Sequence, residues 1–143
     1  MRYAYPVALD PEPDRSAINV SFPDVAEALT WGENETEALE LAQDCLVTAL
    51  DWRLRHGKPV PRPGPARGRP TIAVPPLVAA KLALYTAMRE RGIDEDQLAR
   101  RLGVSDKVVQ SMLQLKRRTH VALLERALAQ LGVQLEVSVR EAA

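Results

Sequence analysis

The chain of 143 residues is long enough for one ordinary domain or two small ones, and its 46% hydrophobic and 27% charged residues are typical of a protein that folds in water. Its formal net charge is zero. No stretch approaches the roughly 18 apolar residues that span a bilayer, and the N-terminus lacks the apolar run of a signal peptide. We therefore expect a cytoplasmic protein that has no membrane partner.

The zero net charge conceals an asymmetry between the two halves of the chain. Residues 1–66 carry six Lys/Arg and eleven Asp/Glu, a net charge of −5, whereas residues 67–143 carry thirteen and eight, a net charge of +5. Such a split predicts partners of opposite charge. DNA repels an acidic domain and attracts a basic one, so only the second half is expected to bind it.

The single cysteine, Cys45, excludes an internal disulfide and a zinc site built from several cysteines. Its neighbours Leu41, Ala42, Leu46 and Ala49 predict a small buried side chain. We expect neither a metal nor a cofactor.

Two alternating segments near the N-terminus predict β-strands. Residues 3–9 and 18–22 alternate between apolar and other side chains, and the Pro- and Asp-rich segment 10–14 between them favours a turn. We expect an antiparallel hairpin with the apolar side chains of the second strand on one face.

From Asn34 the apolar period becomes helical. Asn34 and Glu37 form a capping-box-like start, and the apolar stripe from Leu39 to Leu50 predicts a helix that ends near Gly57. A small sheet with one packed helix is small for an independent core, so burial against a partner or a second copy would help it.

Seven of the eleven prolines lie between residues 58 and 76. This excludes a helix and predicts an extended connector over about 58–70, which would let the two halves move separately. Residues 71–74 then return as another strand on the hairpin, and the first domain closes near residue 75. The predicted domains are therefore 1–75 and 76–143.

In the second half, the spacing of the apolar residues predicts four helices. They are expected over residues 77–91, over 94–102, from Ser105 onward, and over 120–131. Residues 133–140 alternate like a strand that has no obvious partner in its own domain. We predict that it pairs with a second copy and forms a homodimer or a larger assembly, with contacts from Leu135, Val137 and Val139. The alternative is a strand folded back onto the last helix.

Residues 97–105, followed by 108–113, resemble the helix-turn-helix of phage repressors. Ala99 is small where the two helices cross, Gly103 makes the tight turn, and Ser105 satisfies free backbone donors at the start of the second helix. The core of the pair is expected to be filled by Val104, Val109 and Leu113.

This assignment leaves a polar face on the second helix for the major groove of DNA. Lys107 can donate to guanine, Gln110 can pair with adenine, and Ser111 can contact base or phosphate. Asp106, which could accept from cytosine, and Gln114 lie on the same face. The predicted phosphate contacts are Arg100, Arg101, Lys116 and Arg117. The alternative is a generic helical hairpin with a solvated basic face.

With both halves placed, the chain resembles the HicB family of antitoxins over nearly its full length. The N-terminal segments that carry the resemblance are Tyr5-Pro6-Val7, Val20-Ser21-Phe22-Pro23-Asp24, Thr30-x-Gly32 and Glu37-Ala38-Leu39-x-x-Ala42. In the C-terminal half they are Val74-Pro75, Ala79-Ala80-Lys81-Leu82-Ala83-Leu84-Tyr85 and the helix-turn-helix. The chain departs at residues 25–29, where the family often has a glycine, and a changed turn before Thr30 is expected.

The resemblance implies that the N-terminal domain has a truncated ribonuclease H-like fold and that it binds and blocks a small HicA-type toxin that cleaves messenger RNA. It also implies that the complex represses its own operon. The acidic first half fits a basic, RNA-binding toxin. The predicted toxin contacts are Asp10, Asp24, Glu33 and Glu37, with the alternative that each is only solvated surface.

Two other functions stay open: a stand-alone transcription regulator whose N-terminal domain senses a small molecule, and a metal-dependent nuclease. A ribonuclease H-like site needs several convergent carboxylates around a divalent metal, and only Asp10 lies near a plausible strand position. His56 and His120 have no visible catalytic partner. We therefore predict an α+β binding protein and no enzyme.

Overall fold

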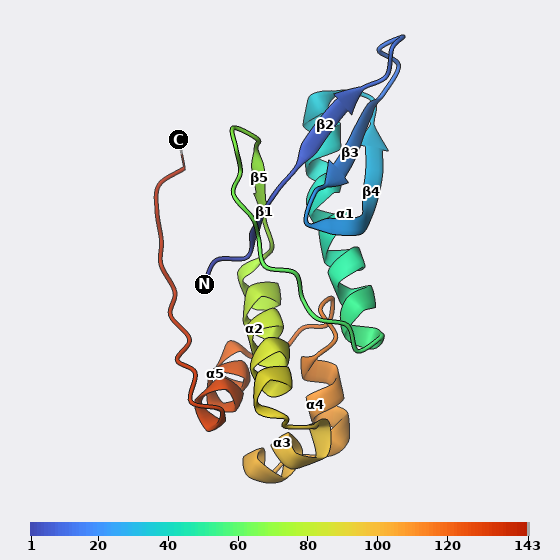
Figure 1. The fold of residues 1–143 in the computed structure, drawn as a ribbon. Coiled ribbons are helices and arrows are strands. Elements are labelled where there is room, and N and C mark those ends of the chain that lie inside the picture. Colours follow the sequence, from blue (N-terminus) through green and yellow to red (C-terminus); the bar gives the residue numbers. More distant parts are fainter. Residues whose placement is uncertain (143) are drawn as a thin grey trace. The chain divides into compact units, whose positions relative to one another are not determined.

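The protein, described for residues 1–142 in a computed structural model, is an α+β protein of two compact units (Figure 1). The first unit holds β1 (Ala4–Pro6), β2 (Ala8–Pro11), β3 (Ile18–Phe22), β4 (Val25–Gly32), α1 (Glu35–Arg55) and β5 (Thr71–Ala73). The second begins within α2 (Pro76–Arg91) and continues through α3 (Glu95–Leu102), α4 (Asp106–Met112) and α5 (Val121–Gln130). The boundary between the units falls after Ala79, four residues beyond the predicted one. Ala143, the end of the predicted second domain, lies outside the described residues.

The first unit is built on a three-stranded antiparallel sheet in the order β2-β3-β4, and α1 covers one face of it (Figure 1). Val20 and Phe22 of β3 are buried on the side of the helix. The expected hairpin is confirmed for β2 and β3, with Leu9 opposite Val20. The first expected strand is split at Val7, and its first part, β1, pairs antiparallel with β5 in a separate ribbon.

Strand β4 was not expected, because residues 25–29 are rich in alanine, glutamate and leucine, which favour a helix. Pairing with β3 overrides this preference, which is weak compared with tertiary context. The pairing of β3 with β4 has a register shift between Ser21 and Phe22, after which Phe22 lies opposite Val25.

Helix α1 begins and ends where the sequence indicated. Asn34 is the N-cap, and its side-chain oxygen accepts a hydrogen bond of 2.9 Å from the backbone N–H of Glu37. The helix ends at Arg55, and Gly57 adopts a left-handed conformation with φ of 65°. The buried stripe that faces the sheet consists of Ala38, Ala42, Leu46, Val47, Ala49, Leu50 and Leu54.

The proline-rich segment 58–70 is not a free linker, because it is held against the first unit by hydrogen bonds. The Tyr5 hydroxyl donates to the carbonyl of Pro61 (2.7 Å), and the backbone N–H of Gly64 donates to the Asp24 carboxylate (2.9 Å). The backbone N–H of Val7 donates to the carbonyl of Pro70 (2.9 Å). Proline has no N–H to donate, but its carbonyl oxygen can still accept a hydrogen bond, and such bonds can hold a proline-rich segment in place. The burial of Tyr5 raises the pKa of its phenol, which keeps the hydroxyl protonated as a donor.

The C-terminal segment corrects a second expectation, because residues 133–142 contain no strand in the described chain. Leu131 is buried and Leu135 is half-buried, but Val137 and Val139 are 77% and 94% exposed. The strand folded back onto α5 is not formed either. A strand needs a neighbouring strand for its backbone hydrogen bonds, and residues 80–142 of this unit contain helices but no strand.

Candidate functional site

The first candidate site is the pair of helices α3 and α4 in the second unit. A full capping box starts α3: the Asp94 side chain accepts from the N–H of Gln97 (2.8 Å), and the Gln97 side chain accepts from the N–H of Asp94 (2.9 Å). Gly103 ends the helix with φ of 69°, and α4 begins three residues later at Asp106. Ala99 and Val109 are both buried in this pair. The left-handed backbone of Gly103 ends α3 and lets the chain change direction, so that α4 packs against α3 at an angle.

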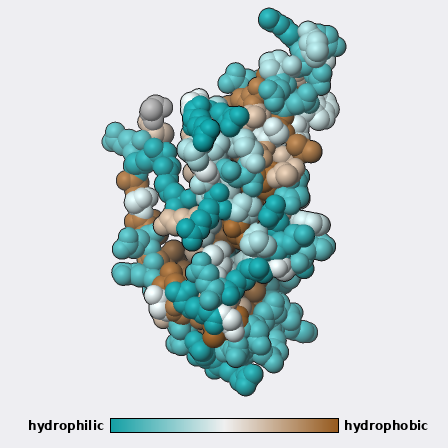
Figure 2. All heavy atoms as spheres, in the orientation of Figure 1, coloured by the Kyte–Doolittle hydropathy of each residue, from teal (hydrophilic) through white to brown (hydrophobic). Residues whose placement is uncertain are grey.

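The predicted DNA contacts lie on the surface of this pair. Lys107, Gln110 and Gln114 are exposed, and Ser111 is half-buried. The surface is hydrophilic where α3 and α4 lie, at the lower end of the view in Figure 2. The remaining predicted contacts are exposed as well: Arg100, Arg101, Asp106, Lys116 and Arg117.

Two details of the pair differ from the prediction. Ser105 is the N-cap of α4, but its side chain makes no capping hydrogen bond. Val104 and Leu113 are only half-buried, and the inward apolar positions beside Val109 are taken by Met112 and Leu115, which are fully buried. Helix α4 ends at Met112, so the helical spacing no longer decides which of the following side chains point inward.

A carboxyl pair marks the start of α4. The side chain of Asp96, which lies beside it, raises the pKa of Asp106, while the charge of Arg100 acts in the opposite direction. The two acids are exposed, so the pair places negative charge beside the basic residues. Arg101 is also engaged, since its Nη1 donates to the carbonyl of Gln130 at 3.4 Å.

Lys81 is a residue of this site that the sequence reasoning missed. Its side chain is fully buried, and Nζ donates to three backbone carbonyls, those of Arg117 (2.6 Å), Gln114 (2.7 Å) and Ser111 (3.4 Å). The ammonium therefore holds the end of α4 and the segment that follows it. The signal available in the sequence was a lysine between two apolar residues, Ala80 and Leu82. Both of these are buried on α2 in the structure.

The second candidate site is a groove of about 460 Å³ between β4 and α1 in the first unit. Its apolar lining includes Leu29, Leu41 and Trp52. Cys45 also lines it and is half-buried, so the prediction of a buried cysteine is wrong. Burial and the neighbouring Asp44 carboxylate raise the pKa of its thiol.

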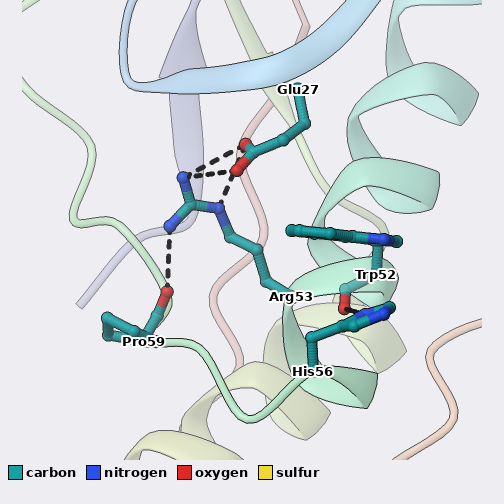
Figure 3. Close-up of polar contacts among 5 residues, drawn as sticks. All are labelled: Glu27, Trp52, Arg53, His56 and Pro59. Atoms are coloured by element: carbon teal, nitrogen blue, oxygen red, sulfur yellow. Dashed lines mark hydrogen bonds and ion pairs between the residues drawn. The ribbon is translucent and has the colours of Figure 1, made fainter.

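One end of this groove is fixed by the side chain of Arg53 (Figure 3). Its guanidinium forms an ion pair with Glu27 of β4 at 2.8 Å and donates to the carbonyl of Pro59 at 3.2 Å. It therefore ties α1 to both β4 and the proline-rich segment. Beside it, His56 stacks on Trp52 with 4.3 Å between ring centroids, and its Nδ1 lies 2.8 Å from the Trp52 carbonyl oxygen.

The four predicted toxin contacts do not form one cluster. Glu33 and Glu37 lie on either side of the cap residue Asn34, at the start of α1. Asp10 is exposed on β2. Asp24 is half-buried and binds the backbone of Gly64, which gives it a structural task.

The charge asymmetry persists at the structural boundary. Residues 1–79 carry eight Lys/Arg and eleven Asp/Glu, and residues 80–143 carry eleven and eight, so the net charges of the two units are −3 and +3. Within residues 1–142 no group of three or more His, Cys, Asp or Glu side chains is placed to hold a metal ion. None of the helices described is both long and apolar enough to cross a membrane.

Comparison with known proteins defines the class of this protein as an antitoxin. Residues 4–83 match the family described as the HicB_like antitoxin of bacterial toxin-antitoxin systems. "Antitoxin HicB 1" of Photorhabdus laumondii is 35% identical over 94% of this chain and 86% of its own length. "Antitoxin HicB" of Escherichia coli K12 is 36% identical over 93% of this chain and 96% of its own, and that of Pseudomonas fluorescens is 30% identical over 94% of both. The chain belongs to the HicB-like antitoxin family.

Proposed function

We propose that the chain neutralises a HicA-type, messenger-RNA-cleaving toxin through its first unit and represses its own operon by binding operator DNA through its second. The observation that carries this proposal is the combination of the family match over residues 4–83 with a second unit of net charge +3 that holds the short helix pair α3 and α4. The family supplies the antitoxin role. The net positive charge of the second unit and the geometry of α3 and α4 are the reasons for the DNA-binding role.

In this proposal α3 and α4 form a helix-turn-helix, and α4 enters the major groove of the operator. Lys107 and Gln110 contact base edges, because lysine donates to guanine and glutamine pairs with adenine. The surrounding arginines and Lys116 contact phosphates and set the position of the protein on the duplex. The carboxyl pair of Asp96 and Asp106 limits non-specific binding, since it repels phosphate.

The double substitution Lys107→Ala with Gln110→Ala is expected to abolish operator binding, by a factor of about 100 or more, because two base contacts of about 1–3 kcal/mol each are removed. Fluorescence anisotropy with DNA from upstream of the protein's own gene measures this. Both side chains are exposed, so the melting temperature should not change. The matched control is Arg91→Ala with Gln130→Ala, which removes one cation and one amide from exposed positions outside α3 and α4. Unchanged binding by the first variant would contradict the DNA-binding role of α4.

The exposed C-terminal segment supports a homodimer in this proposal. Leu135, Val137 and Val139 alternate along a backbone that has no strand partner within one chain, as far as residues 1–142 describe it, and a second copy can supply it. We expect the full chain to have the mass of a dimer or a larger assembly in light scattering, and a chain that ends at Gly132 to be a monomer. A dimer mass that survives the truncation would place the interface elsewhere.

One observation favours a different function for the first unit. The groove beside α1 has the size of a site for a small molecule, which would suit a stand-alone regulator with a ligand-sensing domain. Co-expression with the neighbouring reading frame separates the two functions. Growth rescue and co-purification of a small basic protein support the antitoxin, whereas an inert neighbour supports the sensor.

A further inference from the structure

The two edges of the three-stranded sheet differ in how well they are protected. Strand β2 forms one edge; it has four residues and ends at Pro11, which lacks an N–H for pairing. Strand β4 forms the other edge and has eight residues, without proline, lysine or arginine. Its only charged residue, Glu27, is neutralised by Arg53. Soluble proteins usually guard a long edge strand with charge, proline or a covering element, so this edge is suited to pairing with another chain.

Apolar side chains border the same edge. Leu29 is 69% exposed and Trp31 56% exposed on β4, and Leu41 on α1 is 41% exposed. Leu29 and Leu41 line the groove together with Cys45. Large apolar side chains gathered beside an unprotected edge are typical of a surface that a protein partner covers.

The charge around this edge selects the kind of partner. Between residues 16 and 52, which include β3, β4 and most of α1, there are eight Asp/Glu and no Lys or Arg. Glu33, Glu40 and Asp44 are exposed among them. An uninterrupted acidic segment of this length attracts and orients a basic partner.

We propose that the toxin docks along β4, with a basic, extended segment that adds a fourth strand to the sheet, places its apolar side chains in the groove beside Leu41 and Cys45, and turns its cations toward the acids of α1. This inference rests on the proposed toxin-neutralising function and assigns its surface. Strand addition supplies backbone hydrogen bonds for affinity, and the groove and the acids supply selectivity. Of the carboxylates predicted from the sequence, Glu33 directly follows β4 and Glu37 lies one turn before Leu41 on α1, whereas the Asp24 carboxylate accepts a hydrogen bond from Gly64.

The single cysteine provides a direct test, because it lies in the groove and is the only thiol of this chain. The purified complex with the toxin, co-expressed from the neighbouring reading frame, and the free antitoxin are each treated with a maleimide. We expect modification of Cys45 to be at least about tenfold slower in the complex, and equally fast in both samples after unfolding in urea. Equal rates in the native samples would overturn the inference. Protection of the free antitoxin that grows with its concentration would overturn it too, because a second copy would then occupy the edge.

A pair of matched substitutions on α1 gives a second test. Leu41→Arg and Thr36→Arg each add one positive charge at an exposed position of the same helix, but only Leu41 lines the groove. We expect Leu41→Arg to weaken toxin binding at least about tenfold and Thr36→Arg to change it less than about threefold, with circular dichroism showing both folded. Equal binding by the two variants would overturn the docking surface while the function stands. If the unsubstituted antitoxin also fails to bind the toxin, the result contradicts the proposed function and, with it, this inference.

Discussion

Replacing Lys81 with methionine is expected to lower the free energy of unfolding of the second unit by about 3 kcal/mol and to impair operator binding at the same time. Methionine keeps most of the volume of the lysine stem, so little packing is lost. The loss comes from the carbonyls of Ser111, Gln114 and Arg117, which no longer have the ammonium as their donor. A hydrogen bond to a charged group contributes about 1.5–3 kcal/mol, and three acceptors depend on this one.

Chemical denaturation of the variant, followed by circular dichroism, measures the loss of stability. Lys107→Met is the matched control, because it removes the same charge from an exposed position of the same unit and should change the stability by less than about 0.5 kcal/mol. The two variants therefore separate the two effects: Lys107→Met weakens DNA binding alone, and Lys81→Met weakens both. Equal stability of the two variants would show that the buried ammonium does not hold this segment.

The effect on DNA follows from the position of the clamped segment. Gln114, Lys116 and Arg117 are predicted DNA contacts that lie in or next to the segment whose carbonyls Lys81 binds. If this segment loosens, ordering its side chains on the phosphates becomes entropically costly, and fewer phosphates are neutralised in the complex. The variant is therefore expected to show a reduced slope of log affinity against log salt, by nearly one for each phosphate that is no longer neutralised. An unchanged slope would confine the role of Lys81 to stability.

Those parts of the fold that have a local physical cause could be predicted from the sequence. Asn34 and Glu37 place the start of α1 because the cap is a local hydrogen bond, and Gly103 places the turn between α3 and α4 because its backbone is left-handed. The exposed positions of Lys107 and Gln110 follow from the helical period alone. Local hydrogen bonds and helical spacing carry this information without any knowledge of the rest of the chain.

Features that depend on distant parts of the chain could not be predicted in this way. Strand β4 has a helix-forming composition, and only its pairing with β3 makes it a strand. The alternation of residues 133–140 predicts a strand, but pairing requires a neighbour that one chain does not provide within its described residues. Leu29 and Leu41 line one groove only because α1 packs on β4. Sequence periodicity shows which residues share a face, but it does not show which faces meet.

The substitution Gly32→Ala is expected to destabilise the first unit by about 3 kcal/mol and thereby to abolish toxin neutralisation. Gly32 is buried at the end of β4, where a Cβ atom would lie 2.5 Å from the backbone nitrogen of Ala38 and 2.8 Å from its Cα. Both are backbone atoms of α1, so no side chain can rotate away and the helix itself must move. Thermal denaturation measures the cost, and co-expression with the toxin measures the loss of growth rescue.

Gly64→Ala is the matched control for this prediction. Neither glycine has a positive φ, so alanine meets no backbone penalty at either position. At Gly64 the nearest atom to the new Cβ is a carboxylate oxygen of Asp24 at 3.2 Å, which can shift by a few tenths of an ångström. Alanine also restricts the unfolded chain, which favours folding by about 0.4–1 kcal/mol, so Gly64→Ala should be close to neutral. Equal effects of the two substitutions would mean that α1 can move away from β4 at little cost, and the groove between them would then not be a rigid surface for the toxin.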